Sequence, residues 1–271
     1  MPDPAPPPRV LALANQKGGV GKTTTAINLA AALAARHRTL LVDLDPQGNA
    51  STGLGIPRAE RGAGSYALLV EGRPLAQCIR RTAIPNLHLI PADPDLAGGE
   101  LELVDLPSRE TRLRDALTQG AEALRGIEWV LLDCPPSLGL LTLNALIAAE
   151  ALMVPLQTEF YALEGVSQIM RTLERIRGGF NPNLRLDGIV LTMFDRRNNL
   201  SEAVASDVRA HFKAQVYDTV IPRNVRVSEA PSHGLPVTFY DPRSPGAEAY
   251  VKLAAEFLRR HRARLRQEAT A

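Results

Sequence analysis

Residues 15–25, NQKGGVGKTTT, constrain the fold more than any other part of this 271-residue chain. They lie between a strand-like run, RVLALA, and a helix-like run, TTAINLAAALAAR. The glycines at 18, 19 and 21 remove the Cβ atoms that would keep successive backbone N–H groups from converging on an anion. Such a nest at a helix N-terminus binds phosphate. The segment therefore predicts a strand, loop and helix that hold a nucleotide.

The loop carries two lysines, Lys17 and Lys22, five positions apart. Lys22 is expected to reach the β and γ phosphates, and the Thr23 hydroxyl is expected to bind Mg²⁺. Two like charges this close repel each other unless phosphate charges are near or one lysine points elsewhere, and Lys17 is the one free to do so. The usual pattern GxxxxGK[ST] also requires glycine where this chain has Gln16.

Apolar runs rich in Val, Leu and Ile alternate with longer helical patterns. The runs predict strands at 9–14, 39–45, 87–92, 129–134, 151–156, 186–194 and 219–222. The helical patterns span 23–35, 98–119, 138–149, 161–178, 200–212 and 245–267. This alternation predicts an α/β fold, with a mostly parallel twisted sheet and helices on both faces. Pro- and Gly-rich segments at 53–74, 91–99 and 231–246 are expected to be functional loops.

Length and composition favour one soluble domain at 9–271 after a flexible extended tail, MPDPAPPP, at 1–8. The tail lacks the features of a signal peptide, so a cytoplasmic location is expected. Cys78 and Cys134 are too few for a disulfide framework and are expected to be buried, inert thiols. The net charge of +2 does not indicate nucleic acid, and the five arginines between 259 and 266 fit a solvated helix face or a binding patch.

Three carboxylates follow predicted strands. Asp43 and Asp45 lie in VDLDPQGN, and Asp45, at the exit of the strand, is placed to position a water at the γ-phosphate. The alternative is that both side chains cap the following turn. Asp133 ends the apolar strand WVLLD, which is a Walker B pattern. An aspartate there can hold Mg²⁺ directly or through water.

The form KGGxGK[ST] resembles the deviant Walker A loop of the ParA/MinD group of P-loop ATPases, in which the extra lysine crosses a dimer interface to the partner's nucleotide. With VDLDPQGN, LLDCPPS, VPLQTEFYALEG and IPRNVRVSEAPSHG also in order, the chain resembles the small ParA (Soj) chromosome-partitioning ATPases over nearly its whole length. The resemblance implies a P-loop fold, slow Mg²⁺-dependent ATP hydrolysis and an ATP-dependent homodimer. It also implies binding of nonspecific double-stranded DNA on the nucleoid, and a ParB-type partner that stimulates hydrolysis.

The resemblance also assigns roles to residues. Those expected to contact ATP or ADP are Lys17, Gly18, Gly19, Val20, Gly21, Lys22, Thr23 and Thr24, with Pro222 and Asn224 at the adenine. The catalytic residues would be Lys17, acting across the dimer, Lys22 and Asp45. The Mg²⁺ site would be formed by Thr23, Asp45 and Asp133. DNA would be contacted by Arg197, Arg223 and Arg226, with Arg196 as a neighbour.

Two other functions remain open. A MinD-like protein would bind membrane through a C-terminal amphipathic helix, but the apolar stripe of residues 245–267 is expected to pack on the domain, because it fades where the arginines begin. A DNA-binding regulator would use ATP only as a structural ligand. Larger ParA proteins carry a helix-turn-helix domain before the phosphate loop, whereas only eight residues precede the first strand here.

Overall fold

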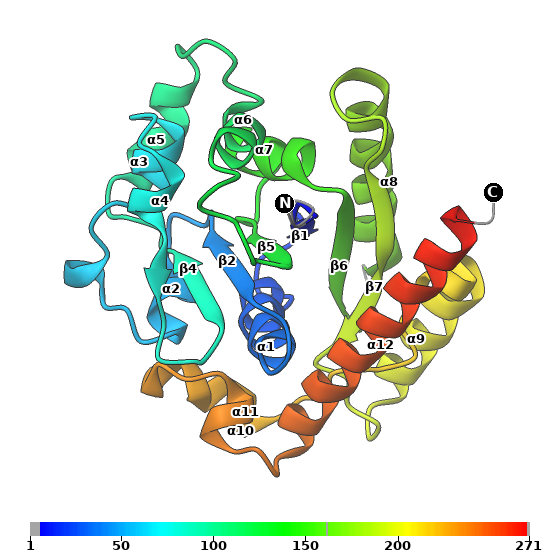
Figure 1. Cartoon of the computed structure of the whole chain (residues 1–271). Coiled ribbons are helices and arrows are strands. Elements are labelled where there is room, and N and C mark those ends of the chain that lie inside the picture. The colour runs from blue at the N-terminus through cyan, green and yellow to red at the C-terminus, as the bar shows by residue number, and fades with distance from the viewer. Residues whose placement is uncertain (1–5, 161, 270–271) are drawn as a thin grey trace.

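The structure is a computed structural model that describes residues 6–160 and 162–269 (Figure 1). Its centre is a seven-stranded sheet in the order β3-β4-β2-β5-β1-β6-β7, in which only the β3–β4 pair is antiparallel. The strands are β1 (Arg9–Leu13), β2 (Thr39–Asp43), β3 (Arg80–Arg81), β4 (Leu87–Ile90), β5 (Trp129–Asp133), β6 (Ala151–Gln157) and β7 (Arg185–Thr192). The predicted α/β fold with a mostly parallel sheet is confirmed.

Helices cover both faces of the sheet (Figure 1). One face packs against α1 (Lys22–Ala34), α11 (Val237–Tyr240) and α12 (Pro245–Glu268). The other face packs against α3 (Ser65–Leu69), α5 (Leu96–Leu103), α6 (Arg112–Gln119), α7 (Leu140–Ala148), α8 (Ala162–Gly179) and α9 (Asn199–Phe212). Three short helices complete the described chain: α2 (Asn49–Gly53), α4 (Leu75–Cys78) and α10 (Val225–Glu229).

The strand sequences read as continuous apolar runs because both sides of the sheet are buried. In β1, Leu11 and Leu13 face the core that contains α1 and α12, whereas Ala12 faces the core that contains α7 and α8. All three side chains are at most 1% exposed. Successive strand residues point to opposite faces, so a central strand needs apolar residues at every position.

The register of the sheet brings the ends of three strands together. Leu13 of β1 and Asp43 of β2 are both paired with Asp133 of β5. The segments that follow these three strands therefore leave the sheet at one edge. Ligands of open α/β sheets bind at this edge, beyond the carboxyl ends of the strands.

Six of the seven expected strands are present, but the expected strand at 219–222 was wrong. The Glu256 carboxylate accepts hydrogen bonds from the amides of Asp218 and Thr219, both at 2.9 Å, so these two amides cannot pair with a neighbouring strand. Pro222 has no amide hydrogen. The segment still makes an isolated bridge between Pro222 and Phe194. The Ile221 amide donates to the Leu191 carbonyl and the Ile221 carbonyl accepts from the Phe194 amide, and these contacts do not extend into a strand. The antiparallel edge strand β3 was not expected.

The expected helix at 98–119 is two helices, α5 and α6, separated by residues 104–111. Pro107 and Ser108, which has a φ of 53°, lie in this interruption. A proline lacks the amide that a helix requires, and a positive φ is incompatible with helical backbone. Parts of the expected loops are also helical, since α2 and α3 overlap 53–74, α5 begins within 91–99, and α11 lies within 231–246.

The apolar stripe of the C-terminal helix packs on the domain, as predicted. Tyr250, Leu253 and Phe257 of α12 are at most 2% exposed and lie in the core shared with α1. Among its arginines, Arg260 donates to the carbonyl of Val216 at 2.7 Å, and Arg264 pairs with Asp187 at 3.3 Å. These two side chains fasten the helix to the sheet.

Both cysteines are free and buried, as expected. Burial raises the pKa of Cys78 to about 11 and raises the pKa of Cys134 as well, so neither thiol forms a reactive thiolate at neutral pH. Among the described residues, no helix combines the length and the apolar character that a membrane span requires. Residues 1–5 of the expected N-terminal tail lie outside the described residues.

Candidate functional site

The loop between β1 and α1 contains two glycines in the left-handed backbone region. Gly19 and Gly21 have φ values of 76° and 85°, in the left-handed region where a side chain is strained. Gly21 is the N-cap of α1, which begins at Lys22. The amides of the first helical turn have no partners within the helix, so they are available to an anion.

The structure separates the two lysines of this loop. Lys22 is 6% exposed, and its Nζ donates to the carbonyl of Lys17 at 3.0 Å. Burial lowers the pKa of Lys22, and the nearby carboxylates of Asp133 and Asp45 oppose this shift. The Lys17 side chain is instead 49% exposed and forms an ion pair with Glu159. Thus one ammonium lies inside the loop and the other lies on the surface.

The two carboxylates at the end of β2 have different surroundings. Asp43, the last residue of the strand, is fully buried and accepts hydrogen bonds from the Ser51 amide and hydroxyl at 2.8 and 2.6 Å. Burial raises its pKa to about 6, against the effect of these hydrogen bonds. Asp45, which is 7% exposed, accepts from the Gln47 amide at 3.0 Å through Oδ1. Both side chains therefore stabilise the turn, and both hydrogen bonds from Ser51 tie Asp43 to α2.

Asp133, at the end of β5, is fully buried, and neither of its oxygens has a hydrogen-bond partner among the described residues. Burial and the neighbouring charge of Asp43 raise its pKa, while the nearby Thr23 hydroxyl opposes the shift. A buried carboxylate without a partner is costly. It fits a cation such as Mg²⁺, which is usually held by one or two carboxylates together with phosphate oxygens. Thr23, Asp45 and Asp133 are therefore suitable residues for this ion.

Two polar side chains that were not predicted hold the phosphate loop in place. Asn15 is buried; its Nδ2 donates to the Pro155 carbonyl at 2.8 Å, and its Oδ1 accepts from the Lys17 amide at 3.1 Å. The hydroxyl of Thr192, the last residue of β7, donates to the Val20 carbonyl at 2.8 Å. Asn15 was detectable as a polar residue directly after a buried strand, whereas Thr192 is distant in sequence.

Arg61 is a further functional candidate that sequence reasoning missed. Its side chain is 4% exposed and donates to the carbonyls of Gly48 and Ala92 and to the Thr52 hydroxyl, at 2.8–3.0 Å. A Cβ at residue 48 would collide with this guanidinium. Arg61 therefore fixes the segment that follows Asp45.

Replacing Arg61 by alanine is expected to destabilise the fold by about 2–4 kcal/mol, because two buried carbonyls lose their charged donor. Urea unfolding measures this change. The matched control is Arg58→Ala at an exposed position three residues earlier, where a change below about 0.5 kcal/mol is expected. Equal stability of the two variants would contradict the role given to Arg61.

The residues expected at the adenine lie beside the end of β7. The Ile221 amide donates to the Leu191 carbonyl at 2.8 Å, which places Pro222 and Asn224 near the strand that contacts the phosphate loop. Pro222 is half-buried. The Asn224 side chain caps α10 by accepting from the Val227 amide at 3.3 Å. Its amide group is thereby oriented before any base is bound.

The arginines predicted to contact DNA lie on two adjacent segments. The Arg223 amide donates to the Phe194 carbonyl at 3.0 Å, so the segment containing Arg197 runs beside that of Arg223. Arg197 is 89% exposed and pairs with Asp195 at 3.1 Å. Arg226 has two acidic partners, Glu229 at 2.9 Å and Asp241 at 3.3 Å. Its charge is therefore more neutralised than that of Arg197. Arg196 is exposed next to Arg197.

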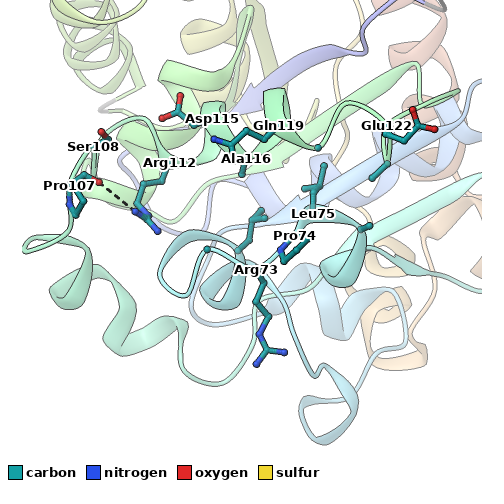
Figure 2. A pocket seen from close by; sticks show the side chains of 15 residues that line it. Arg73, Pro74, Leu75, Pro107, Ser108, Arg112, Asp115, Ala116, Gln119 and Glu122 are labelled. Carbon is teal, nitrogen blue, oxygen red and sulfur yellow. Dashed lines mark hydrogen bonds between the residues drawn. The ribbon is translucent and has the colours of Figure 1, made fainter.

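A cavity of about 710 Å³ lies between the α3–α4 segment and α6 (Figure 2). It contains Pro74 and Leu75 on one side and Arg112 and Ala116 on the other. None of its lining residues belongs to the phosphate loop. Pro107 and Ser108, in the segment between α5 and α6, also line the cavity.

Comparisons with known proteins show which sequences and folds this chain resembles. A family model described as "AAA domain" matches residues 8–186. The chain is 59% identical over 264 residues to the chromosome partitioning protein ParA of Caulobacter vibrioides, covering 96% of this chain and 97% of that protein. It is 55% identical over 253 residues to the chromosome-partitioning ATPase Soj of Thermus thermophilus, covering 93% and 96%.

Among solved structures, the fold is similar to a cobyrinic acid a,c-diamide synthase from Mycobacterium smegmatis with bound ADP and magnesium. The TM-score is 0.81 at 38% identity, covering 94% of this chain and 96% of that one. That protein thus binds a nucleotide and magnesium on the same fold.

Proposed function

Because the chain belongs to the ParA/Soj family of chromosome-partitioning ATPases, we propose that it is an ATP-switched DNA-binding ATPase. Mg²⁺-ATP binding joins two copies, and the dimer binds double-stranded DNA without sequence preference. A ParB-type partner then stimulates slow hydrolysis and releases the dimer. This cycle would place the protein on the nucleoid.

The single observation that carries the proposal is the separation of the two lysines. Lys22 lies within the loop that would hold its own phosphates, while Lys17 is exposed beside it. The ion pair of Lys17 with Glu159 is half exposed, and such pairs contribute only about 0–1 kcal/mol. Lys17 can therefore exchange Glu159 for the triphosphate of a second copy at little cost.

The segments that follow the two strands beside β1 each carry an exposed apolar side chain. Leu138 follows β5 and is 43% exposed, whereas Phe160 follows β6 and is 74% exposed. Since β1 lies between β5 and β6, the loop containing Lys17 leaves the sheet between the two strands that these segments follow. Large apolar side chains around a charged loop favour a protein contact at this edge.

The site can perform phosphoryl transfer, which depends on positioning and on neutralisation of charge at the γ-phosphate. Lys22 and the first amides of α1 would hold the phosphates, and the Lys17 ammonium of the second copy would complete the cluster of positive charge. Asp45 would orient the attacking water and accept its proton. Mg²⁺, when bound near Thr23 and Asp133, would neutralise phosphate charge.

DNA binding is assigned to Arg197 and Arg223, which lie on adjacent segments of the surface. Arginine contacts to phosphate give affinity without sequence information. Arg226 is a weaker candidate, because Glu229 and Asp241 compete for its guanidinium.

Reversing the charge of Arg197 and Arg223 together to Glu is expected to reduce DNA retention at least 100-fold, because repulsion replaces attraction at two phosphate contacts. Retention of random-sequence duplex is measured with ATP, ADP and no nucleotide. Wild-type protein should bind only with ATP, and the variant should keep its DNA-free ATPase rate. Arg209→Glu, on α9, is the control. Equal retention in all three nucleotide states would exclude the switch.

The two other functions have less support. A MinD-like membrane helix needs a free apolar face, but that of α12 is occupied by α1. A regulator that reads an operator would bind one sequence in preference to random competitor DNA, which footprinting with such competitor measures.

A further inference from the structure

Helix α5, beside α3 in Figure 1, presents an apolar stripe to solvent. Leu101 is 78% exposed and Val104 is 46% exposed. Ala97, one turn before Leu101, is exposed as well. Val104 is the C-cap of α5 and still has helical backbone angles. Residues three or four apart share one face of a helix, so these three form a continuous stripe. An aligned set of exposed apolar side chains indicates an interaction site, whereas scattered ones do not.

Most of the charges around this stripe are negative. Residues 94–108 contain no Lys or Arg, and their four carboxylates are Asp95, Glu100, Glu102 and Asp105. Glu100 is half-buried, and the other three are exposed. The next basic residue, Arg109, donates to the Val104 carbonyl at 2.6 Å and also pairs with Glu110 at 3.0 Å, so this cation beside the stripe is largely neutralised. The exposed face of α5 is therefore apolar along its centre and acidic at its sides.

This chemistry selects among possible occupants. A two-fold contact between the α5 helices of two copies would place like charges opposite one another, which is unfavourable. DNA and anionic lipid surfaces carry the same negative sign. A helix with basic residues beside apolar ones complements both features of the stripe.

The buried side of α5 contacts the segment that follows β5. Glu100 lies against Gly139, the N-cap of α7, so closely that a Cβ at residue 139 would collide with its carboxylate. The Glu100 Oε1 is buried and has no hydrogen-bond partner among the described residues. A negative charge at the start of a helix is favourable, so Glu100 and α7 are coupled electrostatically. Gly139 ends the loop that begins at Asp133.

The segment leading into α5 is connected to Asp43, the carboxylate at the end of β2. The Ala92 amide donates to the Ser51 hydroxyl at 3.0 Å, and this hydroxyl donates to Asp43 at 2.6 Å. Arg61 also joins the carbonyls of Ala92 and Gly48. Thus α5 is attached at its start to the loop containing Asp45 and along its buried side to the loop after Asp133.

We propose that the stripe of Ala97, Leu101 and Val104, with its flanking carboxylates, is the docking site for a basic amphipathic helix of the ParB-type partner. Docking acts on the loop after Asp133 through the contact of Glu100 with Gly139 and thereby accelerates hydrolysis. The inference rests on the proposed function, because it assigns a place to the partner assumed there.

The test measures the ATPase rate of the full chain with DNA against increasing concentrations of the purified ParB-type protein of the same organism. Leu101→Asp places a charge within the stripe and is expected to raise the half-stimulating concentration at least 10-fold. Its basal rate, ATP-dependent dimerisation and DNA retention should be unchanged. Val251→Asp, at a 54% exposed position on α12, is the matched control and should behave as wild type.

Glu100→Gln tests the coupling separately from docking. This variant keeps the exposed stripe, so the half-stimulating concentration should stay within about 2-fold of wild type, while the maximal stimulated rate should fall at least 5-fold. A general loss of folding would instead lower the basal rate. Full stimulation of Glu100→Gln would overturn the coupling route.

The outcomes separate the inference from its premise. If wild type is stimulated and Leu101→Asp is stimulated equally, the docking site is wrong and the proposed function stands. If Leu101→Asp fails to form ATP dimers, a second copy occupies α5, which also overturns the inference. If wild type is not stimulated at all, the partner assumed in the proposed function is wrong, and the docking site falls with it.

Discussion

Lys17→Ala is expected to abolish ATP-dependent dimerisation while the monomer still binds nucleotide. The Lys17 side chain is half exposed and pairs with Glu159, whereas the Lys22 ammonium is held inside the loop. Removing one member of a desolvated charge pair costs about 2–5 kcal/mol, and a symmetric dimer loses two such pairs. The dimer dissociation constant should therefore rise by about 1,000-fold or more. Light scattering with and without Mg²⁺-ATP measures this change.

Glu159→Gln is the matched control for that variant. Both substitutions break the ion pair between Lys17 and Glu159, but only Lys17→Ala removes the cation. Glu159→Gln should form dimers at least as readily as wild type, because an exposed pair contributes little and its loss frees the lysine. Normal dimers of Lys17→Ala in the presence of ATP would reject the role of this lysine.

Asp45→Ala is expected to lower ATP turnover by about 100-fold or more, because a residue that positions and deprotonates water contributes this much to the rate. Dimerisation and DNA retention should persist, so the ATP dimer should accumulate. Single-turnover hydrolysis measures the rate, and light scattering measures the dimer.

Asp45→Asn separates the charge of this residue from its part in the turn. The asparagine keeps an oxygen that can accept from the Gln47 amide, as Asp45 does now. If the carboxylate acts on water, Asn and Ala should be equally slow. A rate near wild type for Asn, with only Ala impaired, would show that Asp45 matters through the loop and not through chemistry.

The sequence predicted those elements whose structure follows from the residues within them. The strands at β1, β2 and β5 are continuous apolar runs, and a run of that kind is stable only when buried on both faces. The left-handed positions of the phosphate loop were marked by glycine. Family motifs added the expected site residues, and their roles stay predictions.

Other features depend on partners that are distant in the chain. Residues 219–222 were predicted as a strand because they include the β-branched apolar residues Val220 and Ile221, but the Glu256 carboxylate on α12 accepts from the amides of Asp218 and Thr219. Asp43 is held by a hydrogen bond from the Ser51 hydroxyl. The buried Arg61 guanidinium donates to the carbonyl of Ala92, which lies 31 residues away. No local pattern indicates such contacts.

The sequence by itself determined the parallel α/β sheet, the phosphate loop and the membership of the family, because apolar periodicity and glycine placement are local properties. The tertiary structure decided which lysine is inside the loop, which of the two aspartates at the end of β2 accepts hydrogen bonds from α2, and which face of α5 stays open. Each of these depends on burial and on hydrogen bonds between elements brought together only by folding, and so each was fixed by packing and not by any single segment.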